Sequence, residues 1–273
     1  MMQRRQVTQG HGGENDHGLE RGDFGDRPCR STVILVVVGL LLATLAALAI
    51  DRPLSQWLLA GNCPKPLVTL FHVAEPFGHG MGVVLILLAI HQLAPGYRRA
   101  LPYVVAGSLG AGLSANVIKM SITRMRPHHF DFATGIWHSF GTWFPLTSAG
   151  STGQSFPSGH VATAMGLATV LAWLLPRGRI VFYLLASLVA CHRIESGAHF
   201  LSDTLAGAAV GVAIAHIAIH LAQTAAHRTE NSRPGSHAVS SAREPWYQRR
   251  DPIRNTSSQR SVRPSIAPNT EPR

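Results

Sequence analysis

Long uncharged stretches dominate the middle of the chain. Five of them run for about twenty residues or more and are mostly apolar, at 31–50, 76–95, 100–118, 132–176 and 204–226. About twenty consecutive apolar residues are enough for a helix to cross the hydrocarbon core of a bilayer. The pattern therefore predicts a polytopic membrane protein of the all-α class.

A shorter apolar run lies between Arg179 and Arg193 and has only thirteen uncharged residues. By hydropathy alone it fits a buried helix as well as a span. If both ends of the chain lie on the same side of the membrane, the number of crossings must be even, and this run becomes the sixth. We therefore expect a bundle of six transmembrane helices over residues 31–226, with its longest loop over 119–158.

The distribution of basic residues predicts the orientation. With both tails in the cytoplasm, the cytoplasmic segments hold 18 of the 24 Lys and Arg residues, as the positive-inside rule requires. The formal net charge of +10 is concentrated there, which favours contact with an anionic leaflet over nucleic-acid binding. Residues 1–30 and 227–273 are polar, and we expect both to be disordered cytoplasmic tails. The expected location is the cytoplasmic (inner) membrane, with the loop 119–158 facing outward.

Three polar clusters lie at the outward ends of the predicted spans. They are KMSITRMRP at 119–127, PSGH at 157–160 and HRIESGAHFLSD at 192–203. Ionisable residues at membrane depth cost about 2.5–3.5 kcal/mol each, so their retention indicates a function. Taken alone, the first cluster fits snorkelling side chains and the second an ordinary helix start. Together they place cations, two histidines and a carboxylate on one side of the membrane.

The third cluster contains His199 and Asp203, four residues apart, which share a face if the segment is helical. A carboxylate bonded to one ring nitrogen leaves the other free as a nucleophile or base. Arg193 can present a planar fork to phosphate oxygens, and the alternative is a structural ion pair between Arg193 and Asp203. The N–H groups of a helix start beside His160 suit an anion. The combination fits metal-free phosphoryl transfer.

Neither metal nor other cofactor is expected. No carboxylate cluster suited to Mg²⁺ or Ca²⁺ accompanies the cations. Cys29, Cys63 and Cys191 fall in three different environments, without the C-x-x-C spacing of a metal site or the pattern of a disulfide framework.

The three clusters resemble the signature of the type 2 phosphatidic acid phosphatases, also called lipid phosphate phosphatases: KxxxxxxRP, PSGH and SRxxxxxHxxxD. Lys119 and Arg126-Pro127 are separated by six residues and complete the first motif. Residues 157–160 match the second without change, and the third keeps its spacing at Arg193, His199 and Asp203. Glucose-6-phosphatases and vanadium haloperoxidases share the constellation, but membrane spans disfavour the soluble haloperoxidases.

The resemblance implies that His199 attacks phosphorus and forms a phosphohistidine, that Asp203 orients it, and that His160 protonates the leaving oxygen. The residues that would hold the phosphate oxygens are Lys119, Arg126, Arg193, Ser158 and the backbone N–H of Gly159. The serine that opens the third motif is His192 here, which we expect either to assist or to crowd the phosphate. Arg124, outside the motif, is expected to be interfacial or a second phosphate contact.

The expected activity is that of an enzyme, a phosphoric monoester or pyrophosphate hydrolase acting on a lipid or polyprenyl phosphate at the outer face. Phosphatidate, phosphatidylglycerophosphate, undecaprenyl pyrophosphate and the phosphates of lipid A remain open as substrates. The alternatives are a lipid-linked phosphotransferase of the same family, an intramembrane serine protease using Ser158 and His199, and a non-catalytic lipid-phosphate binder. The loop aromatics Trp137, Phe140, Trp143 and Phe144 fit either interfacial anchoring or a lip that guides a headgroup.

Overall fold

The structure is a computed structural model that describes residues 30–144, 146 and 150–231 of the 273-residue chain. The two expected tails, 1–30 and 227–273, lie almost entirely outside the described residues. At the boundaries, Arg30 is the first residue of a helix, and the last described helix continues to Asn231.

Most of the described chain is helical, as expected. The α-helices are α1 (Arg30–Leu59), α2 (Lys65–Ala74), α3 (Gly80–Leu93), α4 (Leu101–Lys119), α5 (Gly159–Leu174), α6 (Arg179–Glu195) and α7 (Leu201–Asn231). Short 3-10 helices are η1 (Glu75–Gly78), η2 (Pro95–Ala100), η3 (Pro127–His129), η4 (Ile136–Ser139) and η5 (Pro176–Gly178). The all-α expectation is met except for one antiparallel pair of strands, β1 (Ile122–Arg124) and β2 (Phe140–Trp143).

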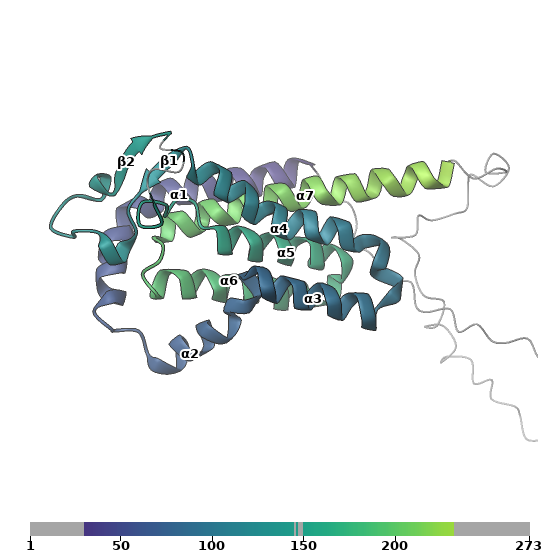
Figure 1. The fold of residues 1–273 in the computed structure, drawn as a ribbon, viewed down its shortest axis with the longest axis horizontal. Coiled ribbons are helices and arrows are strands. Elements are labelled where there is room, and N and C mark those ends of the chain that lie inside the picture. The colour runs from purple at the N-terminus through teal and green to yellow at the C-terminus, as the bar shows by residue number, and fades with distance from the viewer. Residues whose placement is uncertain (1–29, 145, 147–149, 232–273) are drawn as a thin grey trace, which may run out of the picture.

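The helices other than α2 run along the long axis of the molecule (Figure 1). The start of α1 and the end of α7 lie at one end of the bundle, together with the α3–α4 and α5–α6 connections (Figure 1). The β1–β2 pair, the α1–α2 turn and the α6–α7 loop lie at the other end, called here the site end (Figure 1). The chain therefore passes back and forth between two polar ends.

Three of the described helical segments are long and apolar enough to span a membrane: 30–59, 95–119 and 201–226. A fourth candidate is the pair 65–78 and 80–93, which is bent by 67°. The helix α5 is apolar but has 16 residues, and α6 has 17. Length and composition thus support up to four of the six expected spans.

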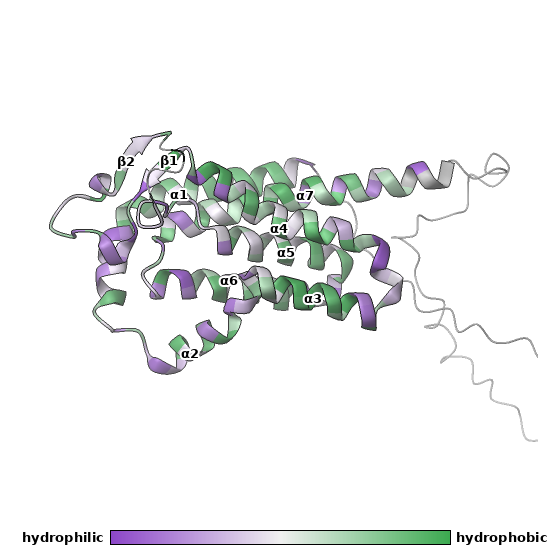
Figure 2. Ribbon diagram, in the orientation of Figure 1, coloured by the Kyte–Doolittle hydropathy of each residue, from purple (hydrophilic) through white to green (hydrophobic). Residues whose placement is uncertain are grey.

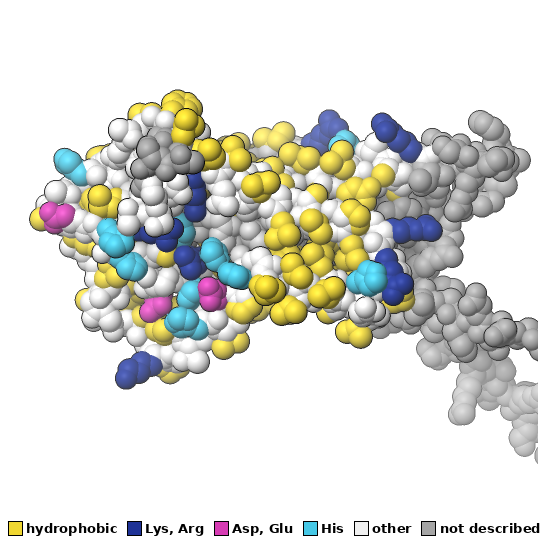
Figure 3. Space-filling model, viewed as in Figure 1, with side chains coloured by type: hydrophobic (Ala, Val, Ile, Leu, Met, Phe, Trp, Pro, Cys, Tyr) yellow, Lys and Arg dark blue, Asp and Glu magenta, His cyan; other side chains and the backbone are white. Residues whose placement is uncertain are grey.

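Hydrophobic side chains cover the outside of the bundle. Leu35 on α1, Leu85 on α3 and Leu113 on α4 are 70%, 61% and 66% exposed. Hydrophobic residues occupy the middle of the helices and hydrophilic ones both ends (Figure 2), and an apolar surface separates two groups of basic and histidine side chains (Figure 3). Contact with water would be unfavourable for such a surface, whereas lipid matches it. The protein is a multi-pass membrane protein.

The helix α5 lies in the centre of the bundle, in contact with α4, α6 and α7, and 12 of its 16 residues are buried. Small residues allow this close packing. A Cβ atom added to Gly166 would lie 2.1 Å from the carbonyl oxygen of Gly107, and one added to Gly211 would lie 2.6 Å from that of Ala162. The packing brings the start of α5 beside the end of α4 and the start of α7, where the three polar clusters lie.

Candidate functional site

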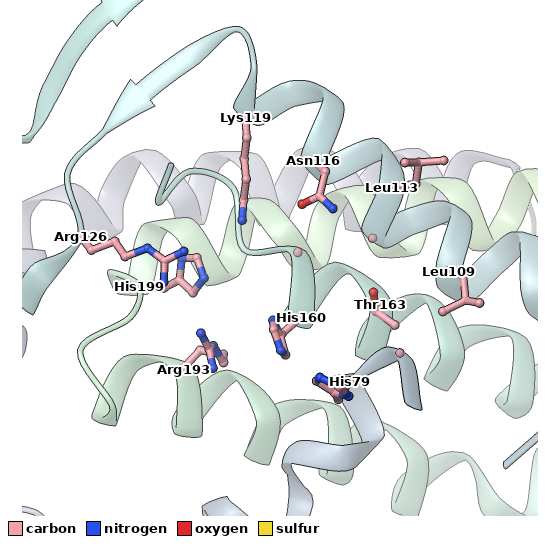
Figure 4. Close-up of a pocket in the computed structure, with 14 residues that line it drawn as sticks. His79, Leu109, Leu113, Asn116, Lys119, Arg126, His160, Thr163, Arg193 and His199 are labelled. Atoms are coloured by element: carbon pink, nitrogen blue, oxygen red, sulfur yellow. The ribbon is translucent and has the colours of Figure 1, made fainter. Parts of the chain in front are cut away.

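The three polar clusters line one cavity of about 420 Å³ at the site end (Figure 4). Its ionisable and helix-start residues include Lys119, Arg126, Gly159, His160, Arg193 and His199. Arg126 and His199 lie at one end of the cavity and Leu109 at the other, with His160 between them (Figure 4). A smaller cavity of about 280 Å³ shares Arg126 and Arg193 with the first and is otherwise lined by polar residues and Ala198.

The first cluster leaves α4 and turns into the strand β1. Lys119 is the last residue of α4, and its side chain reaches into the cavity (Figure 4). Arg126 is held by the segment that precedes α5: its backbone N–H donates to Thr152 O at 3.1 Å and its Nε donates to Ser151 O at 2.9 Å. These two bonds hold Arg126 where it lines the cavity.

The second cluster places His160 in the first turn of α5, next to Gly159. A Cβ atom on Gly159 would lie 3.2 Å from Asn116 Oδ1 and 3.9 Å from Lys119 Nζ, so the helix start lies against the lysine. Ser158 occupies the N-cap position, but its hydroxyl makes no cap bond and its Oγ is buried without a partner among the described residues. Its N–H donates to Asp203 O at 3.0 Å.

The third cluster depends on a glycine turn. The helix α6 ends at Glu195, and Gly197 has a φ of 63°, a left-handed conformation that commonly ends helices. The N–H of Gly197 donates to Ile194 O at 3.0 Å, and the N–H of His199 donates to Arg193 O at 3.1 Å. The turn therefore holds His199 beside Arg193, whose Nε is buried without a partner among the described residues.

His199 and Asp203 are close, but a serine lies between them. The Nδ1 atom of His199 is 3.7 Å from Asp203 Oδ2, which exceeds hydrogen-bond distance. Ser155 Oγ donates to Asp203 Oδ2 at 2.6 Å and lies 3.4 Å from His199 Nδ1. Asp203 Oδ2 also accepts from the N–H of Phe200 at 2.8 Å, as the third residue of a helix does in a capping box.

These contacts define the tautomer of His199. A serine hydroxyl has one proton to donate, and the short contact assigns it to Asp203. His199 Nδ1 is then the donor to Ser155 Oγ, which leaves the lone pair on Nε2. Burial lowers the pKa of His199 to about 4, although Asp203 acts in the opposite direction. The imidazole is therefore neutral near pH 7, and Nε2 is available as a nucleophile.

Arg124 is neither interfacial nor among the residues that line the cavity, in contrast to the expectation from sequence. It is fully buried, and its guanidinium carbon lies 4.5 Å and 4.4 Å from the ring centres of Phe140 and Phe200. Its Nη2 donates to Asp51 Oδ2 at 2.8 Å, and its Nη1 donates to Asp203 Oδ1. The ion-pair partner of Asp203 is thus Arg124 rather than Arg193.

His192, which replaces the usual serine, also lies apart from the cavity. It is buried, and its ring packs against His72 with 4.6 Å between ring centroids. Its Nδ1 has no hydrogen-bond partner among the described residues. His192 is therefore not among the described residues that line the cavity.

Sequence reasoning missed Ser155, Asp51, Asn116 and His79. Asn116 and His79 line the cavity (Figure 4). Ser155 and Asp51 are buried, and a sequence signal existed only for Asp51, which is the ionisable residue that ends the first apolar stretch. The described residues contain no group of three His, Cys, Asp or Glu side chains that could hold a metal ion.

The loop aromatics divide into two sets. Trp137, Trp143 and Phe144 are largely exposed at the site end, a position that suits either interfacial anchoring or contact with a headgroup. Phe140 instead packs against Arg124.

The model of the PAP2 superfamily matches residues 99–227. The chain is 30% identical over 213 residues to a lipid A 1-phosphatase of Rhizobium johnstonii, an alignment that covers 72% of this chain and 82% of the relative. Among solved structures, it is similar to LpxE of Aquifex aeolicus, with a TM-score of 0.46, 21% identity, and coverage of 63% of this chain and 94% of the other. A PAP2-type phosphatidylglycerolphosphate phosphatase from Bacillus subtilis matches with a TM-score of 0.45 and 18% identity, over 73% and 100% of the two chains.

Proposed function

The chain belongs to the PAP2 superfamily and is a lipid phosphatase, and we propose that it hydrolyses its substrate through a phosphohistidine on His199, without a metal ion. The observation that carries the proposal is a cavity in which the imidazoles of His160 and His199 lie with three cationic side chains (Figure 4). Because a relative is named a lipid A 1-phosphatase, the 1-phosphate of lipid A is the first substrate to test.

In the first step, Nε2 of His199 attacks phosphorus, and the bond from phosphorus to the lipid oxygen breaks. His160 gives its proton to that oxygen, so the lipid leaves as an alcohol. Lys119, Arg126 and Arg193 stabilise the negative charge on the three equatorial oxygens. The unpartnered Nε of Arg193 supports this role, because a buried guanidinium N–H requires an acceptor.

In the second step, water attacks the phosphohistidine and gives its proton to His160. The phosphorus–nitrogen bond breaks, its electron pair returns to Nε2, and inorganic phosphate is released. The two steps regenerate both imidazoles in their starting protonation states, so no further acid, base or metal ion is required.

The shape of the cavity supports a lipid as the leaving group. From Lys119 it extends along α4 to Leu109, ten residues earlier, which is about 15 Å on a helix. The far part is lined by Leu109 and Leu113, and Leu113 is exposed on the outside of the bundle. A phosphate beside His199 would therefore have its lipid on the side of His160, directed toward the apolar surface (Figure 4).

We further propose six spans with both chain ends in the cytoplasm and the site facing outward. The alternation of helix directions along α1, α2–α3, α4, α5, α6 and α7 supports six passes (Figure 1). The α3–α4 and α5–α6 connections lie at the end opposite the site (Figure 1). They contain Arg98, Arg99 and Arg177, and Arg179 opens α6, which agrees with the positive-inside rule. The helix α5 crosses among longer neighbours that bury most of it, whereas α6 exposes apolar side chains such as Ile180 and Leu184, as a span in contact with lipid does.

Phosphate release tests the activity. Full-length protein in detergent with EDTA is assayed against lipid A, phosphatidate, phosphatidylglycerophosphate and undecaprenyl pyrophosphate, beside His199→Ala. We expect release from at least one lipid, and a loss of more than about 10³-fold in the variant. Activity that depends on a divalent metal, or that survives His199→Ala, would overturn the mechanism.

The same assay separates the alternatives. A phosphotransferase would pass the phosphate to a second lipid instead of releasing it, and a binder would hold the lipid without turnover. A serine protease requires an accessible hydroxyl, and the buried Ser158 Oγ does not support it.

Orientation is tested with Cys63, which lies in the α1–α2 turn at the site end. In a variant that keeps Cys63 as its only cysteine, a membrane-impermeant maleimide should label intact cells. Labelling only after the cells are opened would place the site end in the cytoplasm.

A further inference from the structure

We propose that Asp51 and Arg124 are positioning residues for the phosphoryl-transfer reaction, acting on His199 through Asp203. Asp51 belongs to α1, outside the residues matched by the superfamily, and Arg124 belongs to β1. The inference rests on the proposed role of His199 as the nucleophile.

The guanidinium of Arg124 is fixed on all sides. Its Nη2 donates to Asp51, its Nη1 donates to Ser202 Oγ at 2.6 Å and to Asp203, and its Nε donates to Ser139 Oγ at 3.3 Å. Aromatic rings cover it, and Asp51, Arg124 and Asp203 are all fully buried. Such a group has one orientation, so it can set the orientation of whatever it binds.

Asp51 is fixed in turn by the start of α7. Its Oδ1 accepts from the N–H of Ser202 at 3.0 Å, and its Oδ2 accepts from the Ser202 hydroxyl and from Arg124. The carboxylate on α1 thus holds both Arg124 and the first turn of α7, which carries Asp203.

The two oxygens of Asp203 have separate tasks. Oδ1 binds Arg124, while Oδ2 binds Ser155 and the N–H of Phe200 and faces His199. Arg124 therefore prevents the carboxylate from rotating, and the Oδ2 side keeps the proton of His199 on Nδ1. Without Arg124 the carboxylate is free to rotate, and the proton of His199 is no longer held on Nδ1. A proton on Nε2 removes the lone pair that attacks phosphorus.

The net charge of the cluster formed by Asp51, Arg124 and Asp203 also favours phosphorylation of His199. Two carboxylates and one guanidinium carry one net negative charge, buried next to an imidazole that becomes cationic when phosphorus binds to Nε2. Neutralising Asp51 cancels this net charge, which otherwise stabilises the cationic phosphohistidine. Removing both charges restores it, so only the lost positioning of Asp203 lowers kcat in the double variant. The phosphorylation step should slow even if the fold is kept.

A merely structural ion pair between α1 and β1 predicts something different. Breaking it would reduce the amount and the melting temperature of the protein, and restoring a neutral, well-packed pair would restore both activity and stability. The two roles are therefore separated by a double variant that removes both charges.

The experiment measures kcat, KM and Tm for Asp51→Asn, Arg124→Gln and the double variant, on the lipid with the highest wild-type rate. Ser55→Ala is the matched control, because Ser55 is buried on α1 one turn after Asp51 and its Oγ has no partner among the described residues. We expect Asp51→Asn to lower kcat about tenfold with KM changed less than about twofold, since a charge-assisted contact is lost. The double variant should recover Tm but not kcat, and Ser55→Ala should match the wild type.

Recovery of kcat together with Tm in the double variant would overturn the inference, as would wild-type kcat in either single variant. If a single variant does not fold, the double variant alone decides between the two roles. Failure of the proposed function looks different: it is seen as absent phosphate release by the wild type or as activity in His199→Ala.

Discussion

Ser155 offers the sharpest test of how the nucleophile is prepared, because its hydroxyl lies between His199 and Asp203. The change Ser155→Ala removes a donor to Asp203 Oδ2 at 2.6 Å and the neighbour of His199 Nδ1 at 3.4 Å. The site is fully buried, so we expect no ordered solvent to replace the hydroxyl at low cost.

The expected magnitude follows from the partners that remain. A hydrogen bond to a charged group contributes about 1.5–3 kcal/mol. Asp203 Oδ2 keeps the N–H of Phe200 at 2.8 Å, so the lower end of that range applies. About 1.5 kcal/mol lost in the transition state corresponds to a decrease of about tenfold in kcat. KM should change little, because Ser155 is not among the described residues that line the cavity.

The assay is phosphate release in detergent micelles under saturating and limiting substrate, with Tm measured on the same samples. Ser114→Ala is the control, since among the described residues the Ser114 hydroxyl on α4 bonds only to Gly110 O of its own helix, at 2.8 Å. A variant Ser155→Ala with wild-type Tm and kcat within about twofold of the wild type would refute the relay from Asp203 to His199.

Three further predictions test the chemistry and the packing. The first uses p-nitrophenyl phosphate, whose leaving group needs no proton. His160→Ala should release a burst of nitrophenolate equal to the enzyme present and then stop, because no base activates water to hydrolyse the phosphohistidine. A linear time course without a burst would argue against the intermediate. Burial lowers the pKa of His199 to about 4. The decrease of kcat/KM at acid pH, corrected for ionisation of the substrate near pH 6, should therefore have its midpoint well below pH 6.5. A midpoint at pH 6.5 would contradict the lowered pKa of His199. Gly166→Ala places a Cβ 2.1 Å from Gly107 O and should lower Tm strongly, whereas Gly110→Ala, with 3.8 Å to its nearest neighbour, should not.

The sequence predicted most of the ionisable residues that line the cavity. Lys119, Arg126, His160, Arg193 and His199 came from three separated segments, and the structure brings them to one cavity. They could be found because a charge or an imidazole at a span end is conspicuous against an apolar background. The membrane class was equally accessible from hydropathy, whereas a sixth crossing was not, since the apolar run that forms α6 is too short to be distinguished from a buried helix.

The supporting residues were hidden for a physical reason. A serine in a polar loop has no distinguishing pattern, so Ser155 could not be separated from its neighbours. The expectation for Arg124 was wrong about its burial, because an arginine near the end of a span ordinarily lies at the surface. Only the folded chain surrounds it with two carboxylates and two aromatic rings. Sequence spacing likewise suggested a direct contact of His199 with Asp203, because it treated the segment before α7 as helical.

The buried charges also link the assembly of the bundle to the chemistry. An uncompensated Asp51 or Arg124 would be costly at this depth, and removing one partner of such a pair costs about 3–5 kcal/mol. Both are compensated only when α1, β1 and the start of α7 are packed together. The same packing fixes Asp203 and, through Ser155, the ring of His199. A chain whose first helix is misplaced therefore lacks both a stable site end and an oriented His199, so the proposed phosphate site is complete only in the fully packed bundle.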